Sequence, residues 1–233
     1  MHCPCWCPQA KVFHLKIKEL FNGVYLIDGK LATVNLCRGR KVYNEELVLD
    51  NGVEYRMWTP YRSKLSAAML NGIKHMEIKG GSRVLYLGAA TGTTVSHVSD
   101  IVSNEGSIYA VELSERNVRE LIRLCEARRN ILPILSDAME TRNYADSIET
   151  CDIIYQDISA RNQAEIMLAN SVFLKKGGYA YFVIKSQSIN ISKSPKETYK
   201  KELKLLEETF ELVESTSLEP YDSMHLFAIL KKK

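Results

Sequence analysis

The hydrophobic and polar positions of the chain follow two different patterns, one before and one after residue 57. In the first pattern, short apolar runs are separated by turn pairs such as Asp28-Gly29 and Asn51-Gly52. Short runs bounded by such pairs are typical of antiparallel strands joined by tight turns. We therefore expect a small antiparallel β unit over residues 16–57, with strands at residues 23–27, 31–35 and 53–57.

From residue 58 onward, short apolar runs alternate with longer amphipathic stretches. The runs predict five strands followed by two closing strands: residues 84–87, 107–111, 131–135, 151–156, 179–184, 210–213 and 226–230. Ser194-Pro195-Lys196-Glu197 forms a capping box for a late helix. Alternating strands and helices indicate an α/β fold with a doubly wound parallel sheet over residues 58–233.

The boundary between the two patterns carries a helix-start signal. Thr59 precedes Pro60, an order that suits an N-cap followed by proline at the first helical position. We expect one helix from residue 60 to about residue 70, with Leu65, Ala68 and Met69 on its inner face and Lys64 at its edge.

Composition narrows the class of protein without naming a function. The formal net charge is +3, too small by itself to indicate nucleic-acid binding, so we consider local basic clusters as candidate phosphate contacts. These clusters are residues 38–41, 128–129 and 231–233. No apolar run approaches the roughly 18 residues of a membrane span, and we expect a cytoplasmic protein with no membrane partner.

The six cysteines do not form a dense framework. Cys37, Cys125 and Cys151 lie in separate predicted elements, and we interpret them as reduced packing residues. Cys3, Cys5 and Cys7 belong to a leader over residues 1–15 that we expect to be disordered. Their spacing does not match a common zinc site, so we predict no metal.

A glycine turn, Gly88-x-x-x-Gly92, joins the strand at residues 84–87 to a polar helix start. Such a turn allows a ligand to approach the backbone, and the helix that follows favours an anionic group. Glu112, Asp137 and Asp157 each follow a predicted strand, and ligands bind at the carboxyl ends of strands in such sheets. The pattern predicts a nucleoside cofactor, with Glu112 on the ribose and Asp137 on the adenine amine. The turn alone leaves a dinucleotide and a methyl donor both open.

Several motifs in order resemble fibrillarin from about residue 16 to the end. They are residues 62–68 (Arg-Ser-Lys-Leu-Ser-Ala-Ala), 86–94 (Tyr-Leu-Gly-Ala-Ala-Thr-Gly-Thr-Thr), 155–159 with Asn162-Gln163, 184–185, and 219–221 before His225. The resemblance implies a methyltransferase that uses S-adenosylmethionine to methylate ribose 2′-hydroxyls in rRNA and tRNA. Without the glycine- and arginine-rich tail of eukaryotic members, the archaeal type fits better.

By this resemblance, Thr93 and Thr94 line the methionine end of the cofactor, Glu112 and Leu113 the ribose, and Asp137 and Ala138 the adenine. The full expected set is Gly88, Ala89, Gly92, Thr93, Thr94, Glu112, Leu113, Asp137, Ala138, Asp157, Ile158, Ser159, Ala160 and Gln163.

The family's catalytic set falls on Lys64, Asp157, Lys185 and His225. A ribose hydroxyl is a weak nucleophile, so positioning and a general base both help. Our hypothesis is that Lys185 is the base, which requires desolvation and the charge of Lys64 to lower its pKa. Asp157 opposes that shift and orients the lysines, Lys64 holds the target, and His225 supports the pair.

Two positions depart from the family pattern. Met224 stands where members usually carry an acid before the histidine, and Gln187 stands where they usually carry an arginine. We expect the first to affect the orientation of His225 and the second to weaken a contact with RNA or a partner.

The resemblance also implies partners: a Nop-domain scaffold protein, a kink-turn-binding ribosomal-type protein and a box C/D guide RNA that selects the rRNA or tRNA nucleotide. No RNA-reading module of the chain's own stands out. Two alternatives remain open, a stand-alone O-methyltransferase of small molecules and a non-catalytic assembly subunit of an RNA particle.

Overall fold

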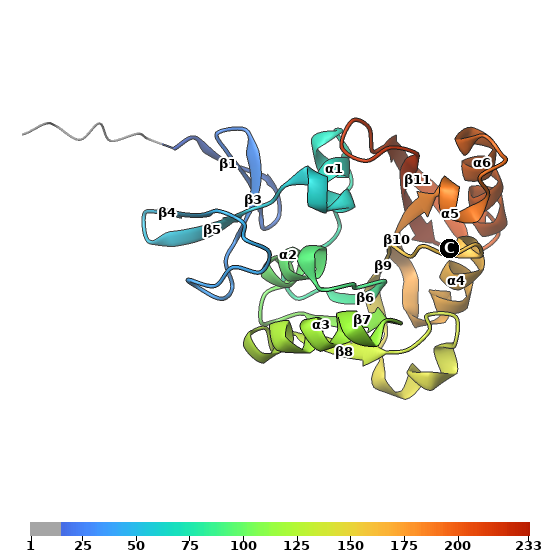
Figure 1. Ribbon diagram of the computed structural model, residues 1–233, viewed down its shortest axis with the longest axis horizontal. Helices are drawn as coiled ribbons and strands as arrows, with labels where there is room; N and C mark the ends of the chain where they lie inside the picture. The colour runs from blue at the N-terminus through green and yellow to red at the C-terminus, as the bar shows by residue number, and fades with distance from the viewer. Residues whose placement is uncertain (1–14) are drawn as a thin grey trace, which may run out of the picture.

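The computed structural model describes residues 15–233, which form two β-sheets with helices around the larger one (Figure 1). The predicted cysteine leader therefore lies outside the described residues. The first sheet is antiparallel, in the order β1-β2-β3-β5-β4. Its strands are β1 (Ile17–Phe21), β2 (Val24–Ile27), β3 (Lys30–Val34), β4 (Leu47–Asp50) and β5 (Val53–Met57). The expected antiparallel unit is confirmed, with two edge strands, β1 and β4, that the apolar pattern did not reveal.

The second sheet has seven strands in the order β11-β12-β10-β9-β6-β7-β8. Strands β10, β9, β6, β7 and β8 run parallel, and β12 is antiparallel to both β10 and β11. The bounds are β6 (Arg83–Leu87), β7 (Ser107–Glu112), β8 (Ile131–Leu135), β9 (Cys151–Gln156), β10 (Leu174–Lys185), β11 (Phe210–Ser217) and β12 (His225–Lys232). The predicted doubly wound sheet with two closing strands is confirmed.

Helices cover both faces of this sheet (Figure 1). They are α1 (Lys64–Leu70), α2 (Thr93–Val102), α3 (Glu115–Ala127), α4 (Gln163–Asn170), α5 (Ser186–Ile189) and α6 (Pro195–Leu206). Short 3₁₀ turns are η1 (Pro60–Arg62), η2 (Thr141–Asn143), η3 (Ala145–Ser147) and η4 (Ser171–Phe173). The capping box at Ser194 and Glu197 forms as predicted.

The expected helix from residue 60 to residue 70 is wrong in one respect, because it is broken at Ser63. Ser63 has an extended backbone, and its hydroxyl accepts a hydrogen bond from the Ser66 amide. The Thr59 side chain makes no cap. Ser63 is therefore the N-cap of α1, and Lys64 is the first residue of the helix.

The two sheets share one hydrophobic core. Val24 and Leu31 of the first sheet and Trp58 at its exit belong to the same buried cluster as Val98 and Ile101 of α2. Apolar burial across this boundary fixes the small sheet against the larger unit.

A sealed set of charged residues lies in the same boundary, and we call it the interface cluster: Glu45, Arg56, His97, Asp100 and Arg128. Arg56 contacts Glu45 at 2.7 Å and Asp100 at 2.8 Å, and Arg128 contacts Asp100 at 2.6 Å. All five residues are buried. Arg128 is therefore not available as the surface phosphate contact that we expected of residues 128–129.

The remaining cysteines are free thiols. Burial raises the pKa of Cys125 to about 11 and that of Cys151 to about 12. Cys37 donates its thiol hydrogen to the Ala127 carbonyl at 3.2 Å. These contacts agree with a packing role. None of the helices in residues 15–233 has the length and apolar character to cross a membrane.

Candidate active site

A cavity of about 590 Å³ opens at the carboxyl ends of β6, β7, β8 and β9. Its volume lies in the range of small-molecule and cofactor pockets. Nine of the expected cofactor residues line it: Gly88, Glu112, Leu113, Asp137, Ala138, Asp157, Ile158, Ser159 and Ala160. Lys185, one of the expected catalytic residues, also reaches the wall.

Gly88 brings the turn after β6 against the end of β9. Its φ is +85°, and a Cβ at this position would lie 2.7 Å from the Asp157 carbonyl oxygen. A residue with a side chain would be strained in this conformation and would clash with that carbonyl, so the position requires glycine. Glycine at this position therefore fixes one wall of the cavity.

Glu112 holds the loops on either side of the cavity. Its carboxylate accepts hydrogen bonds from the Ala90 amide at 2.8 Å and the Ser114 amide at 2.9 Å. Asp137 accepts one from the Met139 amide at 2.8 Å. Both carboxylates thus face the cavity with orientations fixed by backbone amides, which is what recognition of sugar hydroxyls and an amino group requires.

Five expected cofactor residues do not line this cavity. Gly92 caps α2 in the left-handed conformation, and a Cβ there would collide with Leu124, so this glycine serves helix packing. Thr94 donates to Ser63 at 3.1 Å. Gln163 is buried and ties the Lys185 backbone amide to the loop after β9, at 3.0 Å. The other two are Ala89, whose amide bonds to the Val111 carbonyl, and Thr93, which borders a different hollow.

The structure brings Lys64, Asp157 and Lys185 together at the edge of the cavity. Lys64 Nζ lies 3.2 Å from Asp157 Oδ2, and Lys185 Nζ lies 2.7 Å from Asp157 Oδ1. Lys185 Nζ also donates to the Asp157 carbonyl and to Ser159 Oγ, each at 3.1 Å. Residues from α1 and β10 therefore meet around the carboxylate of Asp157, which follows β9.

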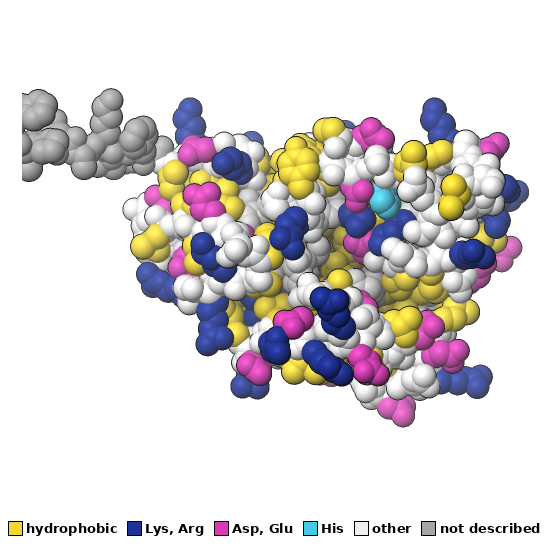
Figure 2. Space-filling model, in the orientation of Figure 1, with side chains coloured by type: hydrophobic (Ala, Val, Ile, Leu, Met, Phe, Trp, Pro, Cys, Tyr) yellow, Lys and Arg dark blue, Asp and Glu magenta, His cyan; other side chains and the backbone are white. Residues whose placement is uncertain are grey.

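His225 joins this group through a residue that the sequence analysis missed. Asp222 Oδ1 lies 2.8 Å from His225 Nδ1, and Asp222 Oδ2 lies 3.6 Å from Lys64 Nζ. An acid three positions before the histidine was the available signal. We call Lys64, Asp157, Lys185, Asp222 and His225 the rim cluster, and Figure 2 shows basic, acidic and histidine side chains together beside the central hollow of this face.

Two contacts in the rim cluster are short without having hydrogen-bond geometry. Asp157 Oδ1 and His225 Nδ1 lie close to Lys185 and Asp222, yet neither atom has a hydrogen-bond partner among the described residues. Both atoms are shielded from water by the residues around them.

Asp157 remains a carboxylate. Burial raises its pKa, but the neighbouring Lys64 and Lys185 ammonium groups outweigh burial, and the net pKa lies below the ordinary value of 3.8. The edge of the cavity therefore holds a permanent negative charge between two cations.

The two departures from the family pattern touch each other. Gln187 Nε2 lies 2.9 Å from the Met224 sulfur. Met224 supplies no carboxylate to His225, but Asp222, three positions before the histidine, places one 2.8 Å from the imidazole.

Comparisons with known proteins give matches over most of this chain. A family model described as Fibrillarin matches residues 15–233. A fibrillarin-like rRNA/tRNA 2′-O-methyltransferase of Thermococcus onnurineus is 49% identical over 225 residues, covering 94% of this chain and 100% of the relative. Aeropyrum pernix fibrillarin, solved with natively bound S-adenosyl-L-methionine, has a TM-score of 0.84 at 40% identity, covering 93% of this chain and 100% of the other. A fibrillarin/Nop5p complex gives 0.85 at 43% identity, with 93% and 100% covered.

Proposed function

The chain belongs to the fibrillarin family, and we propose that it methylates ribose 2′-hydroxyls of rRNA and tRNA with S-adenosylmethionine. One observation carries the proposal: the cofactor-sized cavity and the rim cluster share Asp157 and Lys185. A site that only bound a nucleoside would have no use for two ammonium groups around a carboxylate at its edge. The Thermococcus onnurineus relative named above is an rRNA/tRNA 2′-O-methyltransferase by name, which supports the same reaction class.

The cavity suits S-adenosylmethionine on three counts. Gly88 leaves backbone within reach, Glu112 is oriented for the ribose hydroxyls, and Asp137 is oriented for the adenine amine. We further assign Leu113, Ala138 and residues 157–160 to the walls around the cofactor. When bound, this cofactor supplies an electrophilic methyl group.

The rim cluster positions the ribose and removes its proton. Lys64 is half-buried and can hold the hydroxyl or its neighbouring phosphate. Lys185 must first give up one proton to solvent, after which its Nζ takes the hydroxyl proton, while Asp157 and Ser159 keep that nitrogen in place. His225 and Asp222 hold Lys64 from the other side. A positioned base of this kind contributes about 10²- to 10⁴-fold in rate.

Target choice belongs to the partners. A solved relative forms a complex with Nop5p, which supports a Nop-domain scaffold for this chain. We assign it to a box C/D particle, where a kink-turn-binding protein nucleates assembly and guide RNA pairs with the target. In such a cytoplasmic particle of the archaeal type, this chain is the catalytic subunit.

The proposal is tested by reconstituting the chain with scaffold, kink-turn protein, guide and target RNA, and following labelled methyl groups. Label in the guided nucleotide that moves when the guide is changed supports the proposal. Label in a small catechol without any RNA would favour the stand-alone enzyme. Particle assembly without label transfer or cofactor binding would favour a non-catalytic assembly subunit.

A further inference from the structure

A second hollow, of about 460 Å³, lies between the loop after β3 and the helices α2 and α3. It does not share a residue with the cofactor cavity. Four exposed cations line it, Arg40, Lys41, Arg62 and Arg123, against one acidic side chain, Glu120. We call it the basic hollow; Figure 2 shows basic side chains interleaved with acidic ones over α3, and further basic side chains beside the small sheet.

Most of the positive charge in the basic hollow is unpaired. Within residues 15–233, Arg40, Lys41 and Arg62 make no ion pair, whereas Arg123 contacts Glu120 at 2.8 Å. Buried Arg128 also borders the hollow, but Asp100 neutralises it. Cations gathered without carboxylate partners create a positive potential that attracts an anion.

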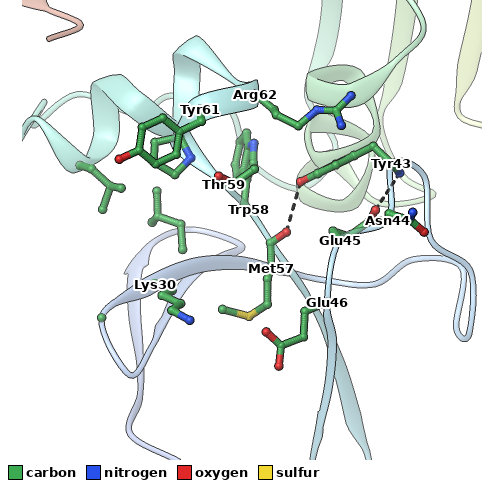
Figure 3. A pocket seen from close by; sticks show the side chains of 14 residues that line it. Lys30, Tyr43, Asn44, Glu45, Glu46, Met57, Trp58, Thr59, Tyr61 and Arg62 are labelled. Atoms are coloured by element: carbon green, nitrogen blue, oxygen red, sulfur yellow. Dashed lines mark hydrogen bonds between the residues drawn. The ribbon is translucent and has the colours of Figure 1, made fainter. Parts of the chain in front are cut away.

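Arg62 is held in place by the packing beneath it. Its guanidinium lies 5.2 Å from the centre of the Tyr43 ring, a cation–π contact. The Tyr43 hydroxyl lies 3.2 Å from the Met57 carbonyl and 2.6 Å from His97 of the interface cluster. Figure 3 shows the two side chains together, on the wall that the basic hollow shares with a neighbouring pocket.

The basic hollow leads to the rim cluster along the chain. Arg62 is two residues before Lys64, and two steps of 3.8 Å keep their Cα atoms within about 7.6 Å. Ser63, between them, is bonded to Thr94 of α2, the helix whose first residue lines the hollow. Cationic side chains therefore extend from the basic hollow to Lys64 of the rim cluster. A polymer with repeated phosphates fits this row of cations better than one isolated anion.

The other two basic clusters are occupied or scattered. Lys232 Nζ donates to the carbonyls of Ser171 and Leu174 at 2.8 and 2.7 Å. Arg128 is buried. Of the three clusters named from the sequence, only residues 38–41 contribute exposed cations to a hollow.

We propose that the basic hollow binds the sugar–phosphate backbone of the RNA strand next to the nucleotide that is methylated. The inference rests on the proposed function and adds a docking surface to it. Arg40, Lys41 and Arg62 each contact a phosphate, and Arg62 passes the strand to Lys64.

The test uses the triple variant Arg40→Gln/Lys41→Gln/Arg62→Gln in the reconstituted particle. We expect KM for target RNA to rise about tenfold or more, and kcat to fall by much less. Each lost phosphate contact lowers the slope of log affinity against log salt by about 0.7 for single strands, so the slope falls by about 2. The double variant Arg40→Gln/Lys41→Gln keeps the Tyr43 stack and loses about 1.4 of slope.

The matched control is Lys196→Gln/Lys200→Gln/Lys204→Gln, which removes three exposed charges from α6. It is expected to keep the wild-type KM and slope, and circular dichroism confirms folding of every variant. If both hollow variants match wild type while wild type methylates RNA, the inference is wrong and the proposed function stands. If the wild-type particle transfers no methyl group to RNA, both are wrong.

Two further measurements separate other anions from RNA. Binding of S-adenosylmethionine to the purified triple variant should equal that of wild type; weaker binding would assign the hollow to the cofactor carboxylate instead. Affinity for the scaffold protein without RNA should also be unchanged; a loss would assign the hollow to an acidic protein surface.

Discussion

The interface cluster and the rim cluster have the same formal make-up and opposite uses. Each contains two cations, two carboxylates and one histidine. The side chains of the interface cluster are 0–1% exposed, whereas those of the rim cluster are 11–34% exposed. Similar sets of charged residues therefore have different uses. In the interface cluster, sealed from water, they hold the two sheets together; in the rim cluster, which water reaches, they form part of the proposed active site.

The kind of cation follows the same division. The cations of the interface cluster are arginines, and Arg56 donates to Glu45, Asp100 and both Ser96 oxygens. Its planar fork satisfies several acceptors at once, which a buried charge requires. The cations of the rim cluster are lysines, whose flexible ammonium groups can change hydrogen-bond partners and can lose or gain a proton. There Lys185 Nζ donates to the Asp157 carbonyl and to Ser159 Oγ, and lies 2.7 Å from Asp157 Oδ1.

Breaking the interface cluster should give the largest effect, a loss in the free energy of unfolding. Asp100→Asn removes the carboxylate that contacts both arginines, and leaving buried charges unpaired costs about 3–5 kcal/mol. Urea unfolding should show that loss in the free energy of unfolding. The control Glu120→Gln breaks an exposed pair and should cost less than about 1 kcal/mol. Equal losses in the two variants would contradict the comparison.

Breaking the rim cluster should lower the rate of methyl transfer and change the free energy of unfolding much less. Lys185→Ala removes the proposed base, and we expect single-turnover methyl transfer to fall about 100-fold or more. The free energy of unfolding should change by less than about 2 kcal/mol, because Lys64 still neutralises Asp157 when Lys185 is removed. Undiminished methyl transfer would exclude Lys185 as the base.

Asp222 sharpens the comparison, because it acts through its neighbours. Asp222→Asn removes the charge beside His225 and Lys64, and we expect kcat to fall roughly tenfold with a shifted pH–rate profile. Asp222→Glu should restore part of the rate. A purely structural role would lower stability in both variants and leave the pH profile where it is.

The buried His97 should make the stability of the protein depend on pH. Burial, followed by the charges of Arg56 and Arg128, holds the pKa of His97 well below its ordinary value of 6.5. The unfolded chain then binds a proton below pH 6.5 that the folded chain does not, so stability falls as the pH falls. One such group contributes about 1.4 kcal/mol between pH 7.5 and 5.5. Unfolding curves at several pH values should show a smaller loss in His97→Gln, and no such change in His75→Gln, whose imidazole is exposed.

Four members of the rim cluster were predicted through the resemblance to fibrillarin, and of these only Asp157 was also expected from its place after a strand. The carboxyl ends of β9 and β10 meet at one edge of the sheet, which brings Asp157 and Lys185 together. Asp222 was missed because its distance to Lys64 depends on how the turn before β12 folds, which no periodic pattern encodes.

The interface cluster could not be predicted for a related reason. Polar residues such as Ser96, His97 and Asp100 interrupt the apolar pattern of α2, as they would on a solvated face. In the structure they are buried, because their partners come from distant segments: Thr33 lies 67 positions from Asp100. Sequence patterns of single elements do not reveal polar groups that are satisfied across two sheets.

The account is tested most directly by methyl transfer in the reconstituted particle to two target RNAs that differ only in the 2′ position of the guided nucleotide. We predict one methyl group per target with the ribose nucleotide, mapped by mass spectrometry to its 2′-oxygen, and none with the 2′-deoxy nucleotide. Equal methylation of both targets, or a methyl group on the base, would contradict the assignment of the rim cluster to a ribose hydroxyl.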